Sequence, residues 1–351
     1  MKKNSFSTWE TLLVGNASGF SILKKTRRFI LELLDKKSHG RTQANTLALK
    51  ILRLASIFDR AERLWARFIL TRLLPFDPLQ EAPQQIEIFI FTSLKDLEIL
   101  PLSIVGASES HIGKITTITV VHPHSIKQEV SEILDSLSKL AVTCLQNSDE
   151  ALLDKYSLSS SFFARSNIKM EVVKIIAALE STQENLLLID GDTVLLQKRN
   201  WVTLSNYIVM VAQEYSNSHI NYDLRILDHF QKTGLGFVTH HQLIKKRNII
   251  QLSELFGGIF SLAQSFENSA EAFYLHGARE FPSEWQLIGD FQLKQDSRAV
   301  HLVNFSNFGI SRSKLPFLFE QPTNLNDLRE NLSYLRNRAI GLGSISFHQY
   351  K

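Results

Sequence analysis

A short apolar run that ends at two aspartates places the strongest constraint on how this chain folds. The run covers residues 186–189, and Asp190 and Asp192 follow it with a single glycine between them. Four consecutive aliphatic residues are typical of a strand that is buried on both faces, as in a parallel sheet covered by helices. Ionised carboxylates are costly to bury unless a partner charge or a cation neutralises them. The segment therefore predicts a central strand whose carboxyl end opens into a polar site.

Strand and helix patterns alternate along the chain before this run. Strands are expected at 86–91, 115–121 and 141–144, and helices at 96–107, 126–140 and 167–179. Such alternation is typical of parallel βα units with right-handed crossovers. Ligands of open α/β sheets bind beyond the carboxyl ends of the strands. In this arrangement Asp190 and the loop at 92–96 lie at the same edge of the sheet.

Asp190 and Asp192 are candidate ligands of a divalent cation. Two carboxylates separated by one residue straddle a turn and can point at one hard cation, and Gly191 lets the backbone come close to a ligand. Mg²⁺ and Mn²⁺ prefer oxygen ligands and often keep substrate phosphates in their coordination shell. The alternative explanation is an ordinary turn that uses Asp and Gly for its backbone geometry.

Three histidines further along are candidates for substrate or metal contact. A short strand is expected to begin near Gly236 and to run into His240 and His241, with a helix after them. Neighbouring strand residues point to opposite faces, so at most one of the two histidines faces a site. His301, which follows a strand start at 298–300, is a further candidate to complete a metal shell. A hydrogen-bonded structural role is the alternative for each histidine.

A serine followed by a glutamate marks the start of a later helix. Ser283 is expected to cap this helix, with Glu284 in its first turn, where the helix dipole favours a carboxylate. A carboxylate held there is a candidate general base towards a substrate hydroxyl. Helix capping alone also explains both residues.

The charge of the chain is unevenly distributed. Residues 1–80 contain 15 basic and 6 acidic residues, a net charge of +9, whereas the rest carries 24 basic and 29 acidic residues, a net charge of −5. Residues 8–75 show helical spacing of apolar residues, and a proline-punctuated linker follows at 75–83. A packed helical extension with a solvated basic face is one interpretation, and attachment to an anionic membrane surface is another. Nucleic-acid binding is not expected, because no recognition motif accompanies the basic residues.

Composition and motifs bound the cellular location and exclude several enzyme classes. Cys144 is the only cysteine, which rules out an internal disulfide and fits a reducing compartment. No apolar run approaches the roughly 18–20 residues that span a bilayer, and no apolar block of a secretory signal follows Met1. We therefore expect a cytoplasmic protein, with peripheral attachment to the inner face of the membrane as an option. The sequence lacks the Gly-x-Ser-x-Gly, Gly-x-Gly-x-x-Gly and Gly-Lys-Ser/Thr motifs of hydrolases, dinucleotide-binding proteins and P-loop proteins.

The order of these segments resembles that of nucleotide-sugar glycosyltransferases of the GT-A type, and more narrowly a poorly characterised bacterial family of GT-A-like proteins. The segments that carry the resemblance are Phe91-Thr92-Ser93, Lys169-Met170 with Val173-Lys174, Ile189-Asp190-Gly191-Asp192, Thr239-His240-His241 and Ser283-Glu284-Trp285. Together they cover about residues 86–310. Trp285 departs from the tyrosine expected in relatives, and the basic residues 1–80 are not part of the common pattern.

The resemblance implies a GT-A-like mixed sheet flanked by helices. It places a catalytic domain at 84–320, after a basic helical extension at 1–80 and before a C-terminal helix and tail at 321–351. It also implies a donor diphosphate held by Mn²⁺ or Mg²⁺ at Asp190 and Asp192, with Glu284 as the acceptor-side base. The implied donor-binding residues are Thr92, Ser93, Lys95, Lys174, Asp190, Gly191 and Asp192. The implied contacts to acceptor or donor are His240, His241, Ser283 and Trp285.

The activity that the resemblance implies is a metal-dependent, inverting transfer of a sugar from a UDP- or GDP-linked donor. The acceptor would be a saccharide or lipid-linked hydroxyl in bacterial surface polysaccharide or glycolipid synthesis. Two alternatives remain. A nucleotidyltransferase also places Asp-x-Asp at a strand end, but that class usually opens with a glycine-rich loop, and residues 89–95 contain no glycine. A catalytically silent GT-A-like scaffold would use the basic helices to bind partners.

Overall fold

The computed structural model describes Leu79 and residues 81–212, 217–227, 236–278, 280–304, 307–312, 324–339 and 342–348. The chain divides into two compact units, one of Met1–Phe76 with Phe230–Leu235 and one of Asp77–His229 with Gly236–Lys351. All described residues belong to the second unit. The basic helices expected within residues 1–80 lie outside the described residues. Of the linker expected at 75–83, Leu79 and residues 81–83 are described.

A five-stranded mixed sheet forms the centre of this unit. Its strands lie in the order β3-β2-β1-β4-β7 and comprise β3 (Thr143–Ser148), β2 (Ile115–His122), β1 (Ile86–Phe91), β4 (Asn185–Asp190) and β7 (His241–Lys245). The first four are mutually parallel, and β7 is antiparallel to β4. The central pair β1 and β4 is the most apolar, because both faces of these strands are buried. The mixed sheet flanked by helices that the sequence predicts is confirmed.

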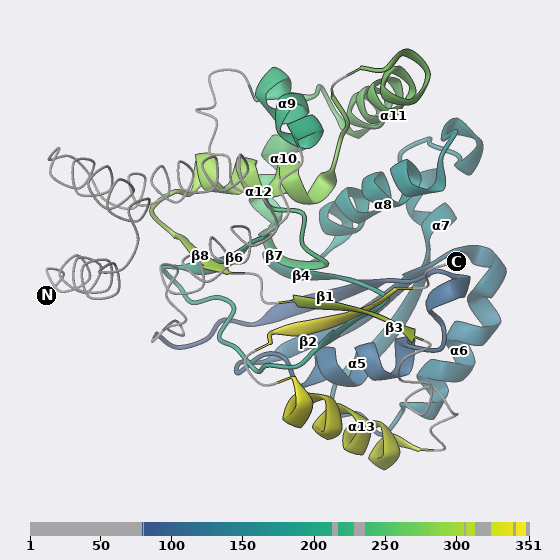
Figure 1. Ribbon diagram of the computed structural model, residues 1–351, viewed down its shortest axis with the longest axis vertical. Coiled ribbons are helices and arrows are strands. Elements are labelled where there is room, and N and C mark those ends of the chain that lie inside the picture. Colours follow the sequence, from purple (N-terminus) through teal and green to yellow (C-terminus); the bar gives the residue numbers. More distant parts are fainter. Residues whose placement is uncertain are drawn as a thin grey trace, which may run out of the picture. The chain divides into compact units, whose positions relative to one another are not determined.

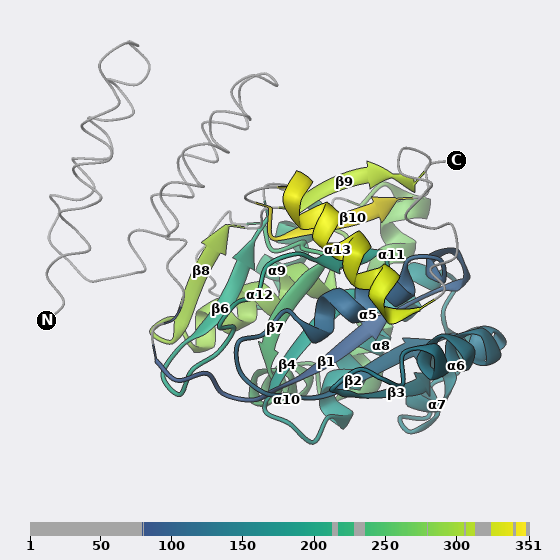
Figure 2. The ribbon, with the colours of Figure 1, turned by 90° about the horizontal axis from the view of Figure 1, so that it is seen from below.

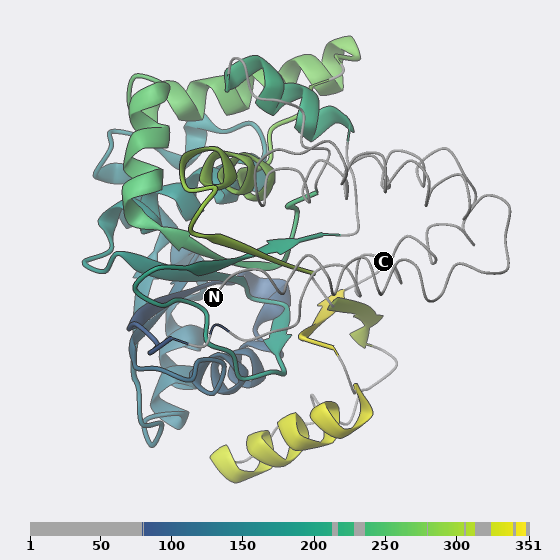
Figure 3. The same cartoon turned by 90° about the vertical axis from the view of Figure 1, so that its left-hand side faces the viewer.

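Helices cover both faces of the sheet (Figures 1 and 3). One face carries α8 (Ser166–Glu180), α10 (Lys246–Leu255) and α12 (Glu284–Gln295), with α7 (Asp149–Asp154), α9 (Asn217–Ile226) and α11 (Ile259–His276) packed on them. The other face carries α5 (Leu100–Ser108) and α6 (Lys127–Ser136). Short 3-10 turns lie at Leu94–Asp96, His124–Ile126 and Ser160–Phe162. Because α8 runs back to the start of β4, its first turns lie towards the carboxyl edge of the parallel strands.

Two smaller sheets extend the unit beyond the central one. One contains β5 (Thr193–Leu195), β10 (Ser344–His348) and β9 (Asn307–Ser311), and the other contains β6 (Tyr207–Val211) and β8 (Val300–Asn304). The last helix, α13 (Leu325–Arg338), packs on α5 (Figure 2). Since β10 is antiparallel to β5, the end of the described chain returns to the strand that follows Asp192.

Four elements differ from the sequence prediction, of which the helix expected at 126–140 is one, because it ends at Ser136. The helix expected at 96–107 begins only at Leu100, after the 3-10 turn, and Pro101 lies in its first turn, where proline is tolerated. The third strand, expected at 141–144, lies at Thr143–Ser148 as β3. It is an edge strand with part of its length exposed, so it needs no apolar run. The strand expected before the two histidines instead begins at His241. Periodicity shows where an apolar segment lies, but it does not show which strand that segment pairs with.

Among the described residues, none of the helices combines the length and the apolar character that crossing a bilayer requires.

Candidate functional site

A tight turn after β4 presents the two aspartates. Gly191 donates its backbone N–H to the carbonyl of Phe91 at 2.7 Å, and a Cβ added at this glycine would lie 2.7 Å from the same oxygen. The hydroxyl of Ser103 on α5 donates to the carbonyls of Gly191, at 3.1 Å, and Thr193, at 2.7 Å. These hydrogen bonds hold the turn in place. Because the backbone of Phe91 comes so close, only glycine fits at the centre of the turn.

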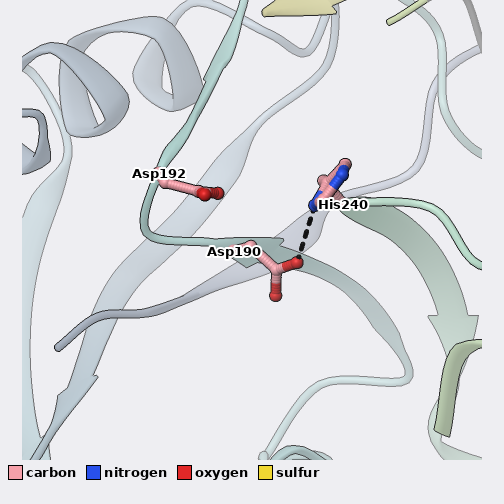
Figure 4. A group of neighbouring side chains, drawn as sticks. All are labelled: Asp190, Asp192 and His240. Atoms are coloured by element: carbon pink, nitrogen blue, oxygen red, sulfur yellow. Dashed lines mark hydrogen bonds and ion pairs between the residues drawn. The ribbon is translucent and has the colours of Figure 1, made fainter. Parts of the chain in front are cut away.

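Asp190, Asp192 and His240 form the one group of at least three potential metal-ligating side chains found among the described residues (Figure 4). One ligand atom from each lies within 4.8 Å of the others. All three side chains are partly exposed, and Nδ1 of His240 lies 3.2 Å from Oδ2 of Asp190. Two carboxylates and an imidazole suit Mn²⁺, which accepts both oxygen and nitrogen ligands. The donor set therefore fits the cation that the sequence predicts.

The two adjacent histidines face opposite ways, as strand alternation predicts. The carbonyl of His240 accepts the backbone N–H of Asp190 at 2.8 Å, which ties this residue to the end of β4. Burial would lower the pKa of His240, but the hydrogen bond to Asp190 and its charge raise it. His241 lies inside the protein with its ring 5.6 Å from that of Trp201, and burial lowers its pKa to about 3. The structure thus brings only the first of the two histidines to the aspartates.

The structure does not bring His301 into the metal-ligating group. His301 lies on β8, paired in register with Ile208 of β6. The third ligand that the sequence analysis expected there is offered by His240 instead.

A buried lysine joins Asp190 to a residue far along the chain. Nζ of Lys174 on α8 lies 2.6 Å from Oδ1 of Asp190 and 2.6 Å from Oε1 of Glu284. The side chains of Lys174 and Glu284 are 7% and 3% exposed, and the ammonium lies 4.3 Å from the centre of the Trp285 ring. Burial opposes the charged forms, yet the carboxylates raise the pKa of Lys174, and Lys174 with His240 lowers the pKa of Asp190 to about 2. Lys174 and Asp190 are therefore both ionised at neutral pH.

Glu171 is a neighbouring carboxyl that the sequence analysis missed. It lies on α8 three residues before Lys174, and its Oε2 is buried with no hydrogen-bond partner in the described part of the chain. Burial and the charge of Glu284 raise the pKa of Glu171 well above its usual value. Residues three apart on a helix share a face, so the spacing to Lys174 was a usable signal.

The residues after β1 divide between the surface and the interior. Thr92 is 1% exposed, and its hydroxyl has no partner within the described residues, whereas Lys95 is exposed. The hydroxyl of Ser93 donates to Oδ2 of Asp96 at 2.6 Å. Arg312, which no sequence motif marks, donates to Oδ1 of Asp96 at 2.7 Å and to the carbonyl of Lys95. The loop is thus held from the C-terminal part of the chain.

The start of α12 is buried. Ser283 occupies the N-cap position, but its side chain makes no capping hydrogen bond. Trp285 is 4% exposed and faces Lys174, as does the carboxylate of Glu284. These two residues are therefore buried around Lys174 rather than presented on an open surface.

No family model and no curated protein matches this chain. Among the solved structures that are similar to it are three glycosyltransferases. One is a galactosyltransferase, LgtC, in complex with donor and acceptor sugar analogues, at 10% identity and a TM-score of 0.39 over 74% of this chain and 86% of that one. Others are mouse xyloside xylosyltransferase 1 (10% identity, TM-score 0.43, 75% and 98%) and GlyE of Streptococcus pneumoniae (12%, 0.39, 76% and 55%). At these values the likeness is loose, and the function has to be inferred from the side chains of the site.

Proposed function

We propose that the protein is a metal-dependent glycosyltransferase of the GT-A type that uses a nucleotide-diphosphate sugar as donor. The observation that carries the proposal is the group of Asp190, Asp192 and His240 at the carboxyl end of β4, with ligand atoms within 4.8 Å of one another. This is the edge at which open α/β sheets bind their ligands. The order of the sequence segments around this group supports the same class.

The donor side follows from the chemistry of these residues. Asp192, His240 and Asp190 would hold Mn²⁺ or Mg²⁺, which supplies positive charge for the diphosphate that leaves. The loop after β1 would receive the nucleotide, with the exposed ammonium of Lys95 near its phosphates. We propose UDP or GDP as the nucleotide, since both carry the diphosphate that such a cation binds.

The acceptor side is proposed from charge. The net charge of +9 over residues 1–80 supports an acceptor that is presented at an anionic membrane surface, such as a lipid-linked saccharide. Such an acceptor fits a role in bacterial surface polysaccharide or glycolipid synthesis, with the protein at the inner face of the membrane.

The proposal is tested by measuring donor binding and cleavage in the full chain. A panel of UDP- and GDP-linked sugars should raise the melting temperature in the presence of Mn²⁺, because a ligand that binds the native state stabilises it. EDTA should abolish cleavage of the donor. Asp192→Asn should lower the cleavage rate by about 100-fold or more, because it weakens the electrostatic stabilisation of the leaving diphosphate, and interactions of this kind dominate catalysis in many enzymes.

Asp135→Asn is the matched control, because Asp135 is an exposed aspartate on α6, away from the metal-ligating group. It should cleave the donor at the wild-type rate. The proposal is wrong if no nucleotide sugar binds or turns over, or if cleavage continues at the same rate in EDTA.

A further inference from the structure

The ion pairs of Lys174 leave Glu284 poorly suited to act as a base. A general base must come within about 2.6–3.2 Å of the acceptor hydroxyl and offer it a free lone pair. The side chain of Glu284 is 3% exposed, and its Oε1 accepts a hydrogen bond from Lys174 at 2.6 Å. The geometry therefore directs this carboxylate at the lysine, and the role that the resemblance implies for it needs replacing.

The charges of the site add up to the opposite of a divalent cation. Asp190, Asp192 and Glu284 each contribute one negative charge, and Lys174 contributes one positive charge. These four groups together carry a net charge of −2, which one Mn²⁺ or Mg²⁺ would cancel.

Lys174 and a divalent cation share one ligand. Oδ1 of Asp190 already holds the ammonium at 2.6 Å, and Asp190 also belongs to the metal-ligating group. If Asp190 were the only counter-charge of Lys174, the ammonium would bind it more strongly. Because the ammonium has two carboxylates as counter-charges, it binds each of them less strongly. Glu284 supplies the second counter-charge at 2.6 Å, and the centre of the Trp285 ring lies 4.3 Å from the same ammonium.

We propose that Glu284 is a positioning residue that acts through Lys174. By sharing the ammonium with Asp190, it sets how strongly Lys174 competes with a divalent cation for that aspartate. The inference rests on the proposed function, because the cation is the one proposed to hold the donor. It assigns no proton transfer to Glu284, so the acceptor hydroxyl loses its proton to another group.

The test uses electron paramagnetic resonance to measure the binding of Mn²⁺ to the full chain without substrate. Glu284→Gln keeps the shape of the side chain and leaves a net charge of −1, so the Kd for Mn²⁺ should rise about tenfold or more. Lys174→Met leaves a net charge of −3, so Mn²⁺ should bind about tenfold more tightly. The double variant Lys174→Met/Glu284→Gln regains a net charge of −2, and its Kd should return to within about threefold of the wild type.

Kinetics separate the two roles of Glu284. For a positioning residue, Glu284→Gln should raise the Mn²⁺ concentration needed for half-maximal donor cleavage, while the rate at saturating Mn²⁺ stays near the wild type. Glu180→Gln is the matched control, because Glu180 lies at the far end of α8 and pairs with the exposed Lys155. It should bind Mn²⁺ as the wild type does.

Each outcome bears on one of the two proposals. If wild type binds Mn²⁺ but Glu284→Gln binds it equally well and loses transfer at every Mn²⁺ concentration, Glu284 is a base and the inference is wrong. The inference also fails if the double variant binds Mn²⁺ no better than Glu284→Gln. If wild type binds no Mn²⁺, the proposed function itself fails. Should Lys174→Met not fold, the other two variants still decide between the roles.

Discussion

The buried Lys174 has partners from two other parts of the chain. Lys174 meets Asp190 and Glu284, which lie 16 and 110 residues away in sequence. Such pairs add little net stability, because desolvation offsets their attraction, but removing one partner strands the other inside the protein. A substitution that removes one of these charges is therefore expected to destabilise the protein unless its partner is replaced as well.

Asp149 gives a residue-scale prediction for the pH dependence of stability. It is the first residue of α7 and is fully buried, with Oδ2 2.6 Å from Nζ of Lys169. Burial, aided by the neighbouring Glu150, raises its pKa to about 6. A carboxyl with a raised pKa stabilises the folded state fully below its unfolded pKa, and this contribution is lost as the pH rises through the folded value.

Asp149→Asn should therefore gain stability relative to the wild type between about pH 4 and about pH 7.5, by on the order of 2 kcal/mol. The free energy of unfolding in urea, measured at both pH values, checks this. Asp154→Asn changes an exposed aspartate at the other end of the same helix and should follow the wild type. Equal pH slopes for Asp149→Asn and the wild type would contradict the assignment.

Helix α12 positions the segment that contains His240. The side-chain carbonyl of Gln286 accepts the backbone N–H of Phe237 at 2.9 Å, and that of Gln292 accepts the N–H of Lys245 at 2.9 Å. The two glutamines therefore hold both ends of the stretch that runs past His240 into β7. Between them, Gly289 lets the buried ring of Phe237 lie directly on the helix.

Gly289→Ala is expected to destabilise the protein even though alanine favours a helix. A Cβ at this position would lie 2.3 Å from Cγ of Phe237, and that ring is fully buried. The gain of about 1 kcal/mol in helix propensity is outweighed by overpacking, which leaves a net loss of roughly 1–2 kcal/mol. Urea denaturation measures the loss, and weaker Mn²⁺ binding should accompany it because His240 follows Phe237.

Gln295→Ala, at the exposed end of the same helix, should change the free energy of unfolding by less than about 0.5 kcal/mol. If Gly289→Ala unfolds at the same urea concentration as the wild type, the contact with Phe237 does not constrain α12.

Some features of the fold and of the site can be predicted from the sequence, and others cannot. The strand at 86–91 is predicted residue for residue, because its apolar run and its burial coincide. The direction of β7 is not predictable, since antiparallel pairing with β4 depends on a tertiary contact and not on periodicity. For the same reason Asp190 and His240 are foreseeable as candidates, whereas the contact of Lys174 with Glu284 is not.

At the scale of the whole folded unit, the C-terminal residues return to the site. The backbone N–H of Phe347 on β10 donates to the carbonyl of Asp192 at 2.8 Å. Arg312 donates to the carbonyl of Phe347 at 3.2 Å and to Oδ1 of Asp96 at 2.7 Å. One guanidinium thus links the loop after β1 to the strand that holds Asp192.

Arg312→Met is expected to destabilise the folded unit strongly. The side chains of Arg312 and Asp96 are 9% and 8% exposed, so the variant leaves a buried carboxylate without its cation. Breaking a buried pair in this way costs about 3–5 kcal/mol. Urea denaturation measures the loss, and hydrogen exchange should show faster exchange at the amide of Phe347, because its strand loses the link to Asp96.

Two comparisons separate the buried pair from the general loss of an arginine. Arg329→Met removes a half-exposed arginine on α13 that lies 3.5 Å from Glu109, and it should cost less than about 1 kcal/mol. Arg312→Met/Asp96→Asn removes the stranded charge and should recover a large part of the loss. If the double variant is as unstable as Arg312→Met, the hydrogen bonds of Arg312 to Phe347 and Lys95, and not the pair with Asp96, join the C-terminal strand to the site.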